Sequence, residues 1–169
     1  MKKILFNNTY RIPSARLLGW DYRTSAPYFI TICTKNRENL FGKIENGEMH
    51  LNNLGQYAVE CIDNISIHSL CATVINQIVM PNHVHLLIEL DNNTTNYQPN
   101  SFGPLLEKSL SSVVNHFKGR VTKHAIQNKM PSGWQERFHD HIVRDAGEYE
   151  RIFNYITNNP QNWKKDMYR

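Results

Sequence analysis

Alternation of apolar and polar side chains predicts most of the strands in this chain. Residues 27–34 are rich in aromatic and β-branched side chains, which is typical of a β-strand. Two further runs of strand length follow at 73–80 and 83–90, separated by Pro81 and Asn82, a pair that suits a turn. The histidine-containing run at 83–90 is otherwise almost entirely apolar, as expected for a strand packed within a sheet.

Shorter runs predict additional strands. Residues 41–44 and 48–51 flank Asn46-Gly47, a strong signal for a tight hairpin turn. A last short strand is predicted at 138–143.

Apolar residues at helical spacing predict three helices. Residues 54–66 bring several apolar side chains to one face, and a longer helix is expected to start at Pro104 and to pack as far as Phe117. A final helix begins after Asp145, with Glu148 three residues later as in a capping box. Strands and helices interleave without a regular βαβ alternation, so we predict an α+β fold in which helices pack on a mainly antiparallel sheet.

The final helix places one tyrosine apart from its core-facing side. At about 100° per residue, Tyr155 lies roughly 110° from the centre of the apolar stripe, whereas Asn159, one turn later, shares its face. We expect the stripe itself to pack inward; it consists of Tyr149, Ile152, Phe153 and Ile156.

Length and composition indicate one globular domain. The 169 residues and 40% hydrophobic content suffice for a real core. We divide the chain into a basic, aromatic arm at 1–26, in which Trp20 and Tyr22 could stack on bases, and a single domain at 27–169. The asparagine-rich stretch 91–101 is expected to form a loop within that domain.

Charge and cysteine usage narrow the function classes. A net charge of +4 and a pI near 9.0 favour a polyanionic partner. Three cysteines without Cys-x-x-Cys spacing argue against a disulfide framework and a cysteine zinc site, and they indicate a reducing cytoplasm. No apolar run approaches the roughly 20 residues of a membrane span. We therefore expect a soluble cytoplasmic protein that does not bind membranes.

His83 and His85 are the leading candidates for chemistry. On a strand, alternate residues share a face, so these two imidazoles project together and can give a metal ion two ligands of fixed spacing. His139 and His141 form a second His-x-His around a charged residue and rank below the first pair, with a supporting role for His141 in orienting the site or touching a polyanion such as DNA. The cations proposed to contact a polyanionic partner such as DNA are Lys118, Lys123, Arg137, Arg144 and Arg151.

These motifs together resemble the single-tyrosine HUH (His-hydrophobe-His) transposases, and among them the REP-associated tyrosine transposases. The string Met80-Pro81-Asn82-His83-Val84-His85 matches the HUH element, and Tyr155-Ile156-Thr157-Asn158-Asn159-Pro160 matches the tyrosine element. Further matching pieces are Tyr28-Phe29-Ile30-Thr31, Leu40-Phe41-Gly42, Phe117-Lys118, Trp134-Gln135 and Asp140-His141-Ile142-Val143-Arg144. The resemblance extends from about Arg11 to Trp163.

The resemblance implies a ferredoxin-like sheet with the tyrosine helix beside the HUH strand. It implies that Tyr155 attacks a phosphodiester of single-stranded DNA to leave a 5′-phosphotyrosine and a free 3′-hydroxyl, and that the site can rejoin strands. It also implies a divalent metal, Mg²⁺ or Mn²⁺, on His83 and His85. The wider group uses a glutamine four residues after the tyrosine as third ligand, and Asn159 occupies that position here.

Other functions and partners stay open at this level. A nucleic-acid-binding protein of the same fold without catalysis is the main alternative, and a metal-dependent hydrolase of small phosphates is a weaker one, because Leu87 replaces the third histidine of nucleotide-binding histidine-triad proteins. The resemblance implies single-stranded or hairpin DNA as substrate, in particular REP-type palindromic hairpins of bacterial genomes. A monomer is favoured and a dimer is possible.

Overall fold

The computed structural model describes residues 17, 19–92 and 108–168. Most of the arm predicted at 1–26 and most of the loop predicted at 91–101 lie outside the described residues. In the described part of the arm, Tyr22 is buried in the core, and its carbonyl accepts a hydrogen bond of 3.0 Å from the Leu110 amide. The Tyr22 ring is therefore a packing residue and is not free to stack on a base.

The central sheet has four antiparallel strands in the order β4-β5-β1-β6. These strands are β1 (Ala26–Cys33), β4 (Ala72–Val79), β5 (His83–Leu90) and β6 (His139–Ile142). With the helices α1 (Asn53–Asp63) and α3 (Leu110–Gln127), the chain order is β1-α1-β4-β5-α3-β6, the arrangement of a ferredoxin-like fold. The predicted fold class is confirmed.

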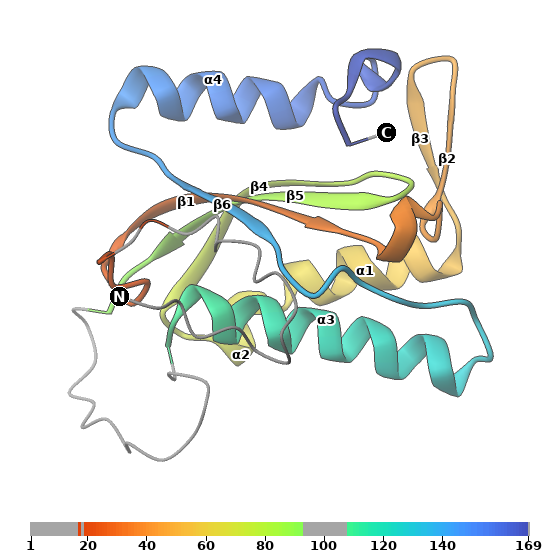
Figure 1. Ribbon diagram of the computed structural model, residues 1–169, viewed down its shortest axis with the longest axis horizontal. Coiled ribbons are helices and arrows are strands. Elements are labelled where there is room, and N and C mark those ends of the chain that lie inside the picture. Colours follow the sequence, from red (N-terminus) through yellow and green to blue (C-terminus); the bar gives the residue numbers. More distant parts are fainter. Residues whose placement is uncertain (1–16, 18, 93–107, 169) are drawn as a thin grey trace, which may run out of the picture.

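Helices cover both faces of this sheet. Helices α1, α2 (Ile65–His68) and α3 lie on one face, and α4 (Ala146–Thr157) crosses the other (Figure 1). The two-residue period of the strands sends Ile30, Val84 and Leu86 to the core beneath α1 and α3, and sends Leu87 toward Ile156 of α4. His83 and His85 share the parity of Leu87, so they also face α4.

A two-stranded hairpin stands beside the sheet, formed by β2 (Gly42–Glu45) and β3 (Glu48–Leu51). Its turn residues Asn46 and Gly47 have φ values of 52° and 80°. A tight type I′ turn needs left-handed φ at both central residues, which Asn-Gly supplies at low cost. The hairpin predicted from this pair is confirmed.

Three details of the predicted helices are wrong. Helix α3 begins at Leu110, because Lys108 has a φ of 58° and the Ser109 side chain caps the helix by accepting from Ser112, so the long helix expected from Pro104 is not continuous through Lys108 and Ser109; residues 104–107 lie outside the described residues. The helix predicted at 54–66 breaks at Asn64, whose side chain bonds instead to the Glu60 carbonyl at 2.7 Å. Phe153, assigned to the core stripe of α4, is 39% exposed.

The C-terminal segment folds back over the sheet. After α4 the chain forms a short 3-10 helix, Trp163–Lys165, and then turns inward, so that its end lies between α4 and the sheet (Figure 1). Two hydrogen bonds hold it there: Arg37 donates to the Met167 carbonyl at 2.9 Å, and Asn82 donates to the Tyr168 carbonyl at 3.0 Å. None of the helices in the described part of the chain has the length and apolar character needed to cross a membrane.

Candidate active site

The paired histidines are held rigidly at the start of β5. His83 lies opposite Cys33 and His85 opposite Thr31 in the antiparallel register with β1, and both side chains are fully buried. Their rings lie 4.5 Å apart between centroids. The prediction that the two imidazoles share one face of a packed strand is confirmed by this register.

Hydrogen bonds fix which ring nitrogen of each histidine remains free. The Asn82 side-chain nitrogen donates to the Tyr168 carbonyl, so its oxygen faces His83 Nδ1, 2.8 Å away, and must accept from it. Thr31 Oγ1 bonds His85 Nδ1 at 2.8 Å. In both rings Nδ1 is therefore engaged and Nε2 points into the site, as in metal centres where an outer partner orients the ligating imidazole.

Tyr155 reaches the histidine pair from α4. Its hydroxyl lies 3.4 Å from His85 Nε2, and its ring meets Phe29 edge-on at 6.0 Å. The side chain is 40% exposed, so part of it faces the histidines and part of it faces solvent.

Asn159 lies just after α4 and is buried, although both its amide nitrogen and its amide oxygen are without a hydrogen-bond partner among the described residues. Buried amides are normally paired, and an unpaired one calls for a ligand. The structure therefore brings Tyr155 next to the two histidines, and the Asn159 amide lies close enough to Tyr155 to act on the pKa of its phenol.

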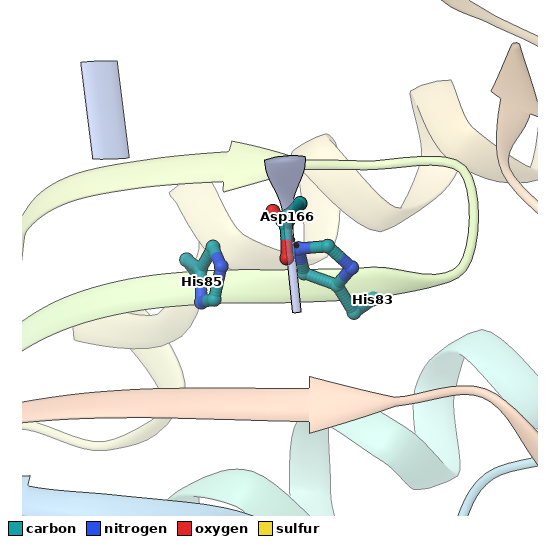
Figure 2. A group of neighbouring side chains, drawn as sticks. All are labelled: His83, His85 and Asp166. Carbon is teal, nitrogen blue, oxygen red and sulfur yellow. Dashed lines mark ion pairs between the residues drawn. The ribbon is translucent and has the colours of Figure 1, made fainter. Parts of the chain in front are cut away.

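The C-terminal segment adds an acidic group that the sequence did not predict. Asp166 Oδ2 lies 3.7 Å from His83 Nε2, and the potential ligand atoms of His83, His85 and Asp166 all lie within 4.8 Å of one another. Figure 2 shows the carboxylate reaching toward the two imidazoles of β5. Two nitrogens and one carboxylate oxygen form a donor set that suits a divalent cation.

Burial controls the protonation of these groups. It lowers the pKa of His83 to about 4 against the opposing charge of Asp166, and it lowers the pKa of His85 well below its usual range, helped by the charge of His83. Burial, followed by the charges of Asp166 and Tyr168, raises the pKa of Tyr155 to about 12, while the Asn159 amide acts in the opposite direction. At neutral pH the imidazoles are thus neutral and the phenol is protonated.

Comparison with known proteins assigns the chain to a family. Residues 23–159 match the family model described as "Transposase IS200 like", which spans most of the chain. The chain belongs to the IS200-like transposase family. The transposase match ends at Asn159, so it includes His83, His85 and Tyr155 but not Asp166.

Individual relatives of this transposase chain agree with that assignment. An uncharacterized protein of Haemophilus influenzae is 37% identical over 166 residues, covering 91% of each chain. A second H. influenzae protein, named as a candidate REP-associated tyrosine transposase, is 27% identical over 82 residues, covering 48% of this chain and 46% of its own. Both the second relative's name and the family match agree with the resemblance stated from the sequence.

A solved structure of a REP-associated tyrosine transposase bound to a REP hairpin shares the fold. It superposes with a TM-score of 0.59 at 18% identity, over 86% of this chain and 72% of the other. At that identity the likeness establishes the fold alone.

The cations predicted to contact DNA fall on two sides of this transposase fold. Arg144 and Arg151 are exposed at the start and on the surface of α4, whereas Lys118 and Lys123 belong to α3 on the opposite face (Figure 1). Lys118 is half-buried and donates to the Gln135 carbonyl at 2.7 Å. Arg137 is exposed shortly before β6.

The second His-x-His lies on the same face as the first but makes different contacts. His141 Nε2 lies 2.7 Å from Glu148 Oε1, and the other oxygen of Glu148 accepts from the Arg144 amide. His139 is exposed, and its ring lies 5.7 Å from that of Tyr168. His141 therefore supports the start of α4, which carries Tyr155 at its other end.

The residues that the sequence reasoning missed are Thr31, Asp166 and Tyr168. Thr31 meets His85 only through the β1–β5 register, and Asp166 and Tyr168 arrive because the C-terminal segment folds back. Asn82 stood in the quoted Pro-Asn-His string, where its side chain gave no signal beyond that of a turn residue.

Proposed function

We propose that this chain nicks and rejoins single-stranded DNA through a covalent 5′-phosphotyrosine on Tyr155. The observation that carries the proposal is the 3.4 Å approach of the Tyr155 hydroxyl to His85 Nε2, within a transposase-family fold. A nucleophile beside a candidate metal ligand, at the exposed end of a buried polar cluster, is the arrangement that phosphoryl transfer to a side chain requires.

The proposed step exchanges one phosphodiester for another. The Tyr155 oxygen bonds to phosphorus, the bond to the 3′ oxygen of the preceding nucleotide breaks, the phenolic proton leaves and the 3′ oxygen gains one. Because the number of phosphate ester bonds is unchanged, the reverse attack by a 3′-hydroxyl rejoins the strand.

The residues present fit a divalent cation. His83 Nε2, Asp166 Oδ2 and both Asn159 amide atoms are buried without hydrogen-bond partners, and the neutral imidazoles are in the form that binds metal. His83 and His85 would hold the ion, and Asn159 is one candidate for a further ligand. When bound, Mg²⁺ or Mn²⁺ supplies Lewis-acid stabilisation of charge on the phosphate.

Hairpin DNA is the proposed substrate class. The structural neighbour is bound to a REP hairpin, and this chain carries a net charge of +4. Arg144, Arg151 and His141 lie on the side of α4 and are proposed to contact the strand near Tyr155, whereas Lys118 and Lys123 lie on the opposite face of the sheet and are not assigned a contact with that strand.

The nucleophile is tested by replacing Tyr155 with phenylalanine. Tyr155→Phe removes one oxygen from a side chain that is 40% exposed, so it should cost little stability, yet it should eliminate the covalent protein–DNA adduct formed with Mg²⁺ or Mn²⁺ and a library of single-stranded hairpins. Tyr149→Phe is the matched control, because Tyr149 packs on the small cluster under α4 and should leave adduct formation intact.

Mass spectrometry of the trapped complex should place the phosphate on Tyr155. An adduct on another tyrosine, or cleavage by Tyr155→Phe, would show that the nucleophile is assigned wrongly. If the wild-type chain binds hairpins but forms no adduct under any divalent metal, the binding-only alternative replaces the proposed activity.

The salt dependence of DNA binding can show whether the cations on each face of the sheet contact DNA. Each phosphate contact that is lost should lower the slope of log affinity against log salt by about 1. We expect Arg151→Gln to produce that change and Lys123→Gln, the matched charge change on the opposite face, to leave the slope as in wild type. Equal slopes for wild type and Arg151→Gln would remove Arg151 from the interface.

A further inference from the structure

We propose that Asp166, delivered by the C-terminal segment, is the anionic third protein ligand of the metal centre on His83 and His85. The inference rests on the proposed metal dependence and adds a ligand that lies seven residues beyond the end of the matched family segment. Under this proposal, the C-terminal segment contributes a ligand to the metal centre.

The first support is a buried contact between two acceptors. Asn82 Oδ1 accepts a hydrogen bond from the N–H at His83 Nδ1, so Nε2 presents a lone pair, and the Asp166 Oδ2 that faces it at 3.7 Å presents another. Neither atom has a hydrogen-bond partner, and both side chains are at most 1% exposed. A cation between them satisfies both atoms, and no neighbouring donor among the described residues does so.

The second support is distance. Two ligand atoms bonded to one ion at roughly 2.1–2.2 Å can be no more than about 4.4 Å apart. The 3.7 Å between Asp166 Oδ2 and His83 Nε2 lies within that limit. The potential ligand atoms of His83, His85 and Asp166 all lie within 4.8 Å of one another, so the group is compact enough to close on a single ion.

The third support is that a hydrogen bond to its other oxygen holds the Asp166 carboxylate in position. Its other oxygen, Oδ1, accepts from the Tyr168 amide at 2.7 Å, which leaves Oδ2 as the free ligand atom. Arg37 fixes the next turn of chain by its bond to the Met167 carbonyl and by stacking over the Tyr168 ring at 5.4 Å. Such outer contacts are what orient a ligating carboxylate.

Direct measurement of Mn²⁺ binding tests the proposal without reference to activity. Mn²⁺ is the probe because it accepts nitrogen and oxygen ligands and its free form is counted by electron paramagnetic resonance. In Asp166→Asn, Oδ1 still accepts from Tyr168, so the amide nitrogen must replace Oδ2 and has no lone pair to offer. The variant keeps the fold of the segment and removes only the ligand.

We expect Asp166→Asn to weaken Mn²⁺ binding by at least the roughly 10–100-fold that loss of an outer partner costs. Asp63→Asn, which removes an exposed carboxylate from the end of α1, makes the same charge change and should bind as wild type. Thermal melts in chelator should show that all these variants are folded.

Each of three outcomes would contradict a different part of the proposal. Wild-type affinity in Asp166→Asn, with loss of binding in His83→Ala, removes Asp166 from the centre but keeps the metal site. Wild-type affinity in Asp166→Asn together with loss in Asn159→Ala assigns the third position to the amide. Absence of Mn²⁺ binding by the wild-type chain overturns both this inference and the proposed metal dependence, while the tyrosine adduct test stands apart.

Discussion

The Tyr155 phenol is a nucleophile kept protonated by its surroundings. Burial and the charge of Asp166 raise its pKa to about 12, against an ordinary value of about 10. Under the proposed ligand role, the Asp166 carboxylate that suppresses the phenolate is also the group whose charge is neutralised when the metal centre is filled. Loading of the site and activation of the nucleophile are then coupled through one side chain.

Asn82 is expected to position both His83 and the C-terminal segment. Its oxygen accepts from His83 Nδ1, and its nitrogen donates to the carbonyls of Tyr168 and Arg37 at 3.0 and 3.4 Å. Asn82→Ala leaves these buried groups unpaired, which should cost about 1–3 kcal/mol in the free energy of unfolding, measured by urea denaturation. Mn²⁺ affinity should fall roughly 10–100-fold, because the His83 tautomer is no longer fixed.

Asn154→Ala is the matched control for that change. Asn154 is exposed on α4, so its replacement should leave Mn²⁺ affinity unchanged and stability within about 0.5 kcal/mol of wild type. Unchanged metal affinity in Asn82→Ala would show that the His83 tautomer does not depend on Asn82.

The sequence identified those site residues that have a local signal. His83 and His85 follow from strand alternation, and Tyr155 with Asn159 from helical spacing. Asp166 has no such signal, because its approach depends on a turn after α4 and on contacts with Arg37 and Asn82 far away in the chain. Contacts made by chain reversal are not visible in short-range periodicity.

At the scale of elements, the helix and hairpin ends were predicted where a side chain enforces them. Asp145 caps α4 by accepting from the Glu148 amide at 2.8 Å, and Asn46-Gly47 turns the hairpin. The start of α3 and the break at Asn64 were missed, because Lys108 and Asn64 adopt conformations that their residue types do not require. Phe153 was misplaced because α4 contacts the sheet along a narrower stripe than its apolar residues suggest.

Two helix glycines are predicted to respond in opposite ways to alanine. A Cβ at Gly55 in α1 would lie 2.2 Å from the Phe41 carbonyl oxygen, whereas a Cβ at Gly119 in α3 meets nothing within 4 Å. Gly55→Ala should therefore destabilise the fold by about 1–3 kcal/mol despite the better helix propensity of alanine. Gly119→Ala should stabilise it by about 0.5–1 kcal/mol, measured by urea denaturation.

One result would contradict the predicted difference between Gly55→Ala and Gly119→Ala. If Gly55→Ala also raises the urea midpoint, helix propensity outweighs the close approach of α1 to the residues before the hairpin. Gly55 would then not be needed for that packing.

Across the whole molecule, stability and function are divided between the faces of the sheet. The large core lies between the sheet and helices α1 and α3, whereas the face under α4 carries a small buried cluster of Leu87, Val143 and Ile156 beside the histidines. The polar site is thus built on strands whose other side is firmly packed, which fixes its geometry with few apolar contacts of its own.

The buried histidines should make the metal-free protein sensitive to mild acid. In the unfolded chain both titrate near 6.5, whereas burial lowers the pKa of His83 to about 4 and that of His85 well below its usual value. For His83 the charge of Asp166 opposes this effect and that of Arg37 adds to it, and burial is the largest cause. Below pH 6.5 the unfolded state therefore binds up to two more protons than the folded state.

The free energy of unfolding in chelator should consequently be highest above pH 6.5 and fall as the pH drops through 6 toward 5. One extra proton in the unfolded state gives about 1.4 kcal/mol per pH unit, so urea denaturation should show a loss of roughly 1–3 kcal/mol between pH 7 and 5.5. This window lies above the range in which carboxylates titrate, so the loss reports histidine. His85→Gln should flatten the dependence by about one proton. A stability that is level from pH 7 to 5.5 in the wild-type chain would mean that these imidazoles take up protons in the folded state, and the site could then not hold them as the neutral ligands that metal binding requires.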